Sequence, residues 1–81
     1  MLRPEQCRAA RAILGWSQSD LAEASLVGRR TIAHFENGSS HVNERTLRDI
    51  KSALEEAGIV FIDPNGGGGA GVRLRDNDER T

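Results

Sequence analysis

Two short helices joined by a four-residue connection are encoded in the first half of this 81-residue chain. Residues 17–20 (SQSD) form a capping-box pattern, in which each outer side chain accepts the other residue's backbone N–H, so a helix is expected from there to about Glu23 or Ala24. A second helix is expected over 29–36, because Asn37-Gly38 is a strong stop signal. Helices this short are not stable alone, so they must pack against each other and against further helices.

Further helices are expected on both sides of this pair. Pro4 suits a first helical turn and Gly15 ends a helix, so the first helix is expected over 4–14. Asn43 can cap a last helix that ends near Gly58. The apolar residues expected to meet in the core recur at helical spacing: Cys7, Ala10, Ile13 and Leu14 in the first helix, and Leu47, Ile50 and Leu54 in the last.

The end of the chain changes from helical to strand patterns. Residues 59–62 (IVFI) are apolar, residues 72–75 (VRLR) alternate apolar and polar side chains, and a glycine-rich loop separates the two segments. A β-hairpin is therefore expected over 59–75, after a helical domain at 1–58 and before a frayed polar tail at 76–81. The expected fold class is mainly α, with four helices and a C-terminal β-hairpin extension.

The net charge of −1 gives no support to nucleic-acid binding and excludes few classes of function. All but one of the positive side chains are arginines, which suits bidentate contacts to guanine and phosphate but also follows from a GC-rich genome. The lone Cys7 has no partner for a disulfide or a zinc site, so a buried thiol is expected. With neither a leader nor a membrane-spanning apolar run, we expect a cytoplasmic protein without cofactor or metal.

Several residues in the helical part resemble one known family in their order and spacing. They are Arg11, Leu14-Gly15-Trp16-Ser17-Gln18, Leu21-Ala22, Thr31-Ile32 and Glu36-Asn37-Gly38. The set resembles the Cro/phage-repressor-type regulators of the XRE family over roughly residues 4–57, and the tail resembles short bacterial members that end in a strand pair. The resemblance implies a helix-turn-helix domain that binds double-stranded DNA and regulates transcription. Two positions depart from the family pattern: Leu26 stands where the turn usually has glycine, and Gly28 where the third helix usually has a serine or threonine cap.

The resemblance also implies roles for individual residues. Arg29, Arg30 and His34 would read bases, Gln18, Thr31, Asn37, His41 and Arg45 would contact phosphates, and Arg11 and Glu36 would form a buried salt bridge. Helical spacing independently supports the base-reading role. Residues 30 and 34 are one helical turn apart and share a face, whereas Ile32 and Phe35 point the other way. The alternative for the arginines and His34 is a merely solvated helix face.

Enzymatic and nucleotide-binding functions have little support in the sequence. The glycines at 66, 68 and 71 formally match G-x-G-x-x-G, but that motif must lead into a helix, and here it leads into an expected strand. No acidic pair or Ser/His/Asp grouping indicates a catalytic centre, and a domain this small has little room for a cleft. We therefore expect a protein that is not an enzyme.

The expected function is a transcriptional repressor that binds an inverted-repeat operator as a homodimer. Both faces of the first strand are apolar, so pairing with a second copy through Val60, Ile62, Val72 and Leu74 would cover the face that the helices leave open. The alternative is a hairpin that only folds back on its own domain. Two other functions stay open. One is the antitoxin of a toxin–antitoxin pair, whose tail binds a toxin; the other is a protein-interaction module that sequesters another regulator, which the near-neutral charge favours.

Overall fold

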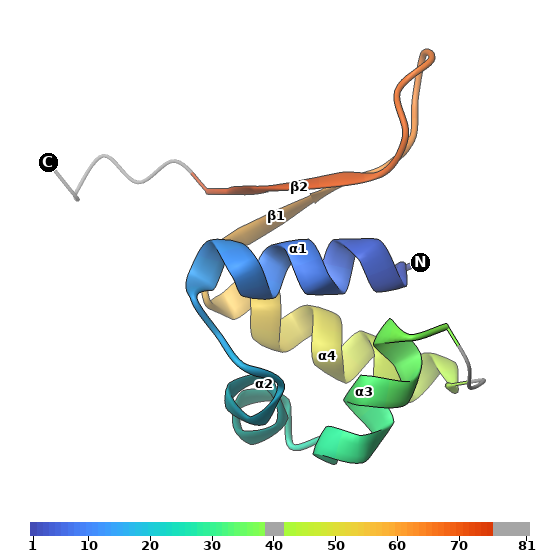
Figure 1. Ribbon diagram of the computed structural model, residues 1–81. Coiled ribbons are helices and arrows are strands. Elements are labelled where there is room, and N and C mark those ends of the chain that lie inside the picture. Colours follow the sequence, from blue (N-terminus) through green and yellow to red (C-terminus); the bar gives the residue numbers. More distant parts are fainter. Residues whose placement is uncertain (39–41, 76–81) are drawn as a thin grey trace, which may run out of the picture.

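Four helices followed by a two-stranded antiparallel sheet make up the fold (Figure 1). The computed structural model describes residues 1–38 and 42–75. Its elements are α1 (Pro4–Leu14), α2 (Gln18–Ser25), α3 (Arg29–Glu36), α4 (Glu44–Glu56), β1 (Ile59–Ile62) and β2 (Gly71–Leu74). The predicted fold class, mainly α with a C-terminal hairpin, is confirmed.

The helix starts follow the capping residues seen in the sequence. The Ser17 hydroxyl accepts the Asp20 backbone N–H at 3.0 Å, and the Asp20 carboxylate accepts that of Ser17 at 2.9 Å. The Asn43 side chain likewise accepts the Thr46 N–H at 2.8 Å and begins α4.

The expected end of α2 near residue 24 was one residue short. Ser25 is still helical and buried, because its hydroxyl donates to the Leu21 carbonyl at 2.7 Å and accepts the Val27 N–H at 3.2 Å. This side chain therefore closes the last turn of α2 and starts the connection to α3.

One hydrophobic core joins all four helices to the first strand. Its most deeply buried side chains are Cys7, Leu21, Ile32, Ile50, Leu54 and Ile59, which come from α1, α2, α3, α4 and β1. The core also takes in Leu2, which sequence periodicity missed because it precedes α1. The prediction for Ile13 was wrong: its side chain is 41% exposed, because it lies about 100° around α1 from Leu14, which is partly buried against the core.

The hairpin lies across α1 and α4, on the side of the molecule away from α2 and α3 (Figure 1). β1 packs against α4, and β2 packs against α1. The Gln6 side chain holds the hairpin against α1. Its amide nitrogen donates to the carbonyls of Gly71 at 3.1 Å and Ile62 at 3.5 Å. Sequence reasoning missed this role of Gln6.

The strand register corrects the expected outer face of the hairpin. Ile59 pairs with Leu74 and Phe61 with Val72, whereas Val60 pairs with Arg73 and Ile62 with Gly71. Directly opposed side chains in an antiparallel pair share a face. Because Ile59 is buried and both Phe61 and Val72 pack on the core, their face is the inner one. The four predicted dimer residues therefore do not share a face: Val60 and Ile62 lie on the outer face and Val72 on the inner one. Leu74 shares the face of Val72, opposite Ile59, but is 41% exposed.

Candidate nucleic-acid interface

α3 has one buried face and one exposed face of opposite character. Ile32 and Phe35 point into the core, and Glu36 is buried with them. The exposed side chains of this helix are Arg29, Arg30, Thr31 and His34. Within the described part of the chain, neither arginine forms a salt bridge. The structure thus gathers the three predicted base-reading residues, with Thr31, on one accessible helix.

The connection between α2 and α3 contains the two departures from the family pattern. Leu26 has φ +63°, the left-handed conformation that glycine adopts most easily, and its side chain is 92% exposed. Its N–H still bonds the Ala22 carbonyl at 2.9 Å, so the turn closes as a glycine would close it. Gly28 precedes α3 without a side-chain cap, as its lack of a side chain requires. The family's turn geometry is therefore kept by a strained leucine.

A buried ion pair joins α1 to the end of α3. The Arg11 guanidinium binds Glu36 through two contacts, Nε to Oε2 at 2.8 Å and Nη2 to Oε1 at 2.7 Å, and it also donates to the Trp16 carbonyl at 3.0 Å. Such a two-point contact fixes orientation as well as charge. The Glu36 side chain is only 2% exposed and that of Arg11 18% exposed, so this pair serves the packing of α3 rather than its exposed face.

Two more side chains complete the hydrogen bonding of the Glu36 carboxylate. The Cys7 thiol donates to Oε2 at 3.0 Å, and the Gln18 amide donates to Oε1 at 3.1 Å. Burial by itself would raise the pKa of Glu36, but the hydrogen bonds from Arg11, Cys7 and Gln18 outweigh it and lower that pKa below its ordinary value. Burial and the bond to Glu36 raise the pKa of the Cys7 thiol, so it stays protonated and serves as a donor.

Gln18 therefore has a structural partner as well as its predicted phosphate. It is the first residue of α2, and its side chain is half-buried against Glu36. A primary amide nitrogen carries two hydrogens, so one remains after the bond to Glu36. The first turn of α2 also carries backbone N–H groups without a partner inside the helix, which is what a helix N-terminus offers to a phosphate.

The remaining predicted phosphate contacts lie around the α3–α4 connection. Asn37 follows α3 directly, and its side chain is exposed. Arg45 is exposed in the first turn of α4. His41 lies outside the described residues.

Arg8 is a neighbour of this site that sequence reasoning missed. It is exposed on α1, and its Nη1 atom donates to the backbone carbonyl of Glu36. The signal was present in the spacing, because Arg8 and Arg11 are three residues apart and therefore lie on the same side of α1.

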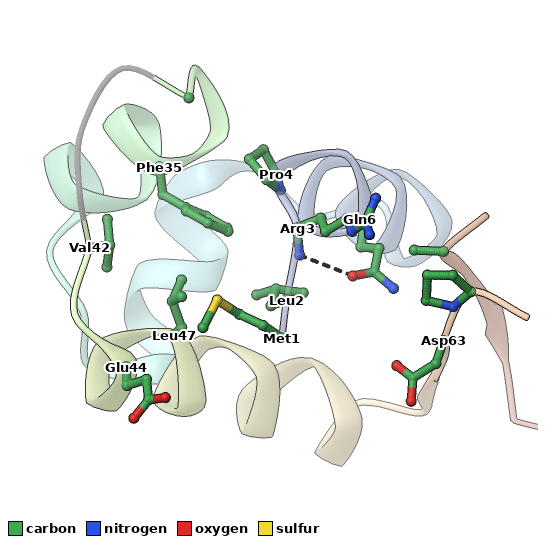
Figure 2. Close-up of a pocket in the computed structure, with 13 residues that line it drawn as sticks. Met1, Leu2, Arg3, Pro4, Gln6, Phe35, Val42, Glu44, Leu47 and Asp63 are labelled. Atoms are coloured by element: carbon green, nitrogen blue, oxygen red, sulfur yellow. Dashed lines mark hydrogen bonds between the residues drawn. The ribbon is translucent and has the colours of Figure 1, made fainter.

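A hollow of about 490 Å³ lies on another part of the molecule, between the start of α1, the end of α3, α4 and the hairpin loop (Figure 2). Phe35, Leu47, Leu2 and Met1 line it, together with the carboxylates of Glu44 and Asp63 at its rim. Its lining includes none of the predicted base or phosphate contacts, and among its described residues it has no serine, cysteine or histidine. A cleft of this size was not expected from the chain length.

Over residues 1–38 and 42–75, no three His, Cys, Asp or Glu side chains come together as a metal site would need. No helix in the same part of the chain is long and apolar enough to cross a membrane.

A helix-turn-helix family model matches residues 8–58, which cover α1 from Arg8 onward, all of α2, α3 and α4, and the turn into β1. A search of curated proteins found no match to the chain.

Proposed function

We propose, because the chain belongs to the helix-turn-helix family of the Cro/phage-repressor (XRE) type, that it represses transcription by binding an inverted-repeat operator as a homodimer. DNA binding and transcription regulation come with the family. The observation that carries the finer proposal is the exposed face of α3, where Arg29, Arg30 and His34 stand clear of the core. The protein is a regulator in this proposal, and not an enzyme.

One set of side chains is proposed to select the DNA sequence, and another to supply most of the affinity. Arg30 and His34, one turn apart on α3, enter the major groove and contact base edges, with Arg29 beside them. Gln18, Thr31, Asn37 and Arg45 bind the phosphates that flank the groove and hold α3 in register. The net charge of −1 does not oppose this arrangement, because the two arginines that open α3 give the contact face its own positive potential.

The first experiment measures binding of the protein to the DNA upstream of its own gene. Fluorescence anisotropy at two salt concentrations, with a shuffled duplex of equal length as the control, separates specific from non-specific binding. We expect tighter binding to the upstream duplex and weaker binding to both at higher salt. Equal affinity for the two duplexes would contradict an operator at that position.

The homodimer is proposed through the outer face of the hairpin. Val60 and Ile62 are half-buried there, beside Gly71 and the exposed Arg73. Both hairpin edges are unpaired in the described structure, and unpaired edges and outward aliphatic side chains favour pairing with a second copy. An inverted-repeat operator would require the two-fold axis of this dimer to set the two α3 helices about 34 Å apart, one turn of DNA.

The dimer is tested by one outward substitution. Deleting the hairpin would also remove the buried Ile59 and expose the core, so a point variant is the cleaner probe. Val60→Asp is expected to give a monomer in sedimentation velocity, and Ser52→Asp, at an exposed position of α4, is the matched control. A folded Val60→Asp protein that still sediments as a dimer would exclude this face.

Sequestration of another regulator is the second candidate, and the near-zero net charge favours it. A sequestering module, or an antitoxin that binds a toxin through the hairpin, uses the outer hairpin face for a different protein. Failure of the wild-type protein to bind either duplex at low salt would favour this candidate over the repressor.

A further inference from the structure

Two side chains from different helices converge on the last residue of α3. Arg8 of α1 donates to the backbone carbonyl of Glu36, and Gln18 of α2 donates to the carboxylate of the same residue. Arg8 and Gln18 therefore bond the same residue, one through its backbone carbonyl and the other through its carboxylate. Asn37, another predicted phosphate contact, is the next residue along the chain.

The charges in this cluster do not balance, and Arg8 is the reason. Arg11 and Glu36 neutralise each other through their two-point contact, and Gln18 is uncharged. Arg8 bonds a carbonyl oxygen, which carries no net charge, so its positive charge is left over among the described residues that touch Glu36. A guanidinium has five N–H donors, and most of those of Arg8 remain for another acceptor because its side chain is exposed.

We propose that Arg8 binds a DNA phosphate next to the one contacted by Gln18. This inference rests on the proposed DNA-binding function, and it deepens the function by adding a contact from α1. The bond to the Glu36 carbonyl holds the guanidinium at the α2–α3 junction, so little side-chain freedom is lost when the phosphate arrives. Arg8 thereby supplies the positive charge that the neutral Arg11–Glu36 pair lacks.

A purely structural role for Arg8 predicts different measurements. A cation that bonds the last carbonyl of a helix stabilises that helix end, whether or not DNA is bound. A variant that lacks such a cap has a lower melting temperature, but its binding to DNA releases as many counterions as that of the wild-type protein. A phosphate contact, in contrast, changes the salt dependence of binding on every sequence.

The test compares the full-length protein with three variants on the upstream duplex and on a shuffled duplex of the same length. Affinity is measured between about 50 and 200 mM salt. Arg8→Gln removes the charge, Arg8→Lys keeps it, and Lys51→Gln is the matched control. Lys51 lies on α4, with its ammonium 5.7 Å from the Phe61 ring, so its replacement also removes one charge and one tertiary contact. A thermal melt of each variant shows the temperature range in which it is folded.

Arg8→Gln is expected to reduce the slope of log K against log salt by about 0.9 per subunit on both duplexes. Arg8→Lys should keep the wild-type slope, and Lys51→Gln should leave it unchanged. A lowered melting temperature with an unchanged slope in Arg8→Gln would overturn the inference and leave a helix cap. An equal loss of slope in Lys51→Gln would overturn it too, since the effect would then belong to total charge. If the wild-type protein binds neither duplex, the proposed function itself fails, which is a separate result.

Discussion

The side-chain amide of Gln18, the first residue of α2, donates a 3.1 Å hydrogen bond to the carboxylate of Glu36, the last residue of α3. Glu36 in turn is held by Arg11 of α1. The residue proposed to meet the DNA backbone is thus part of the same network that sets the angle between the two helices of the motif. DNA binding and folding share this contact, and the first three predictions separate them.

Gln18→Ala is expected to weaken binding to all DNA sequences alike. The variant loses a neutral donor to phosphate, worth about 1.5–3 kcal/mol for a hydrogen bond to a charged group, and it removes no charge. Anisotropy titrations should therefore show a lower affinity on both the upstream and the shuffled duplex, with an unchanged salt slope. A variant that is less stable but binds DNA as tightly as wild type would restrict Gln18 to its bond with Glu36.

Glu36→Ala is expected to lower the free energy of unfolding by about 3–5 kcal/mol, because Arg11 then keeps a charge without its partner. Urea denaturation followed by circular dichroism measures the loss. The matched control is Arg11→Met with Glu36→Leu, which removes both charges and should recover much of the stability. An unfolding midpoint like that of wild type in Glu36→Ala would mean that the pair does not form in solution.

The same pair predicts that acid destabilises the fold. The pKa of Glu36 is lowered in the folded state, so the stability that the carboxylate contributes is present above its ordinary pKa of 4.5 and is lost as the pH falls below that value. Urea titrations from neutral pH to below pH 4.5 should show the wild-type advantage over Glu36→Gln shrinking toward the acid end. A difference that stays constant over this range would speak against the lowered pKa.

Arg30→Ala is expected to cost about 1–3 kcal/mol against the operator if this side chain binds a guanine. The variant should also accept other bases at one position in each half-site, which a panel of operator duplexes with single substitutions would reveal. Arg30 is exposed, so the fold should not change. Equal losses on operator and shuffled DNA would reassign Arg30 to phosphate.

Leu26→Gly is expected to stabilise the domain by up to about 1 kcal/mol. The left-handed conformation costs a residue with a side chain roughly 1–2 kcal/mol, and the greater freedom of glycine in the unfolded chain offsets part of the gain. The 92% exposed leucine gives up almost no packing. Gly15→Ala is the reciprocal control, because Gly15 has φ +70° and open space around it, so alanine there should destabilise. A Leu26→Gly protein with a lower melting temperature would show that the side chain has a contact of its own.

The sequence predicted local features better than it predicted how the layers meet. Ser17 with Asp20 and Asn43 with Thr46 act within one helical turn, so their pattern is readable directly, and it placed the starts of α2 and α4. Leu26 shows the limit of a family pattern, since the backbone keeps the expected turn although the residue is not the usual one.

Long-range contacts were harder to predict, because periodicity does not say which element will cover a face. Gln6 reads as an ordinary polar residue of α1, yet its amide bonds residues 62 and 71 of the hairpin. The hairpin register was also missed: it depends on a loop of glycines, and a change of one residue moves a side chain to the opposite face. Val72, which packs on the core, was for this reason assigned to the wrong side of the sheet, and Leu74 shares its face.

α1 holds the molecule at two points, the end of α3 through Arg11 and the hairpin through Gln6. In the proposed dimer, the rigid helix α1 therefore fixes the distance between α3 and the symmetry axis at the hairpin. Because that distance is fixed, the dimer tolerates little variation in the spacing of the two half-sites. Inserting a single base pair at the centre of the operator would turn one half-site by about 34° relative to the other and move it by about 3.4 Å. The protein should reject such an operator even though every contacted base is unchanged.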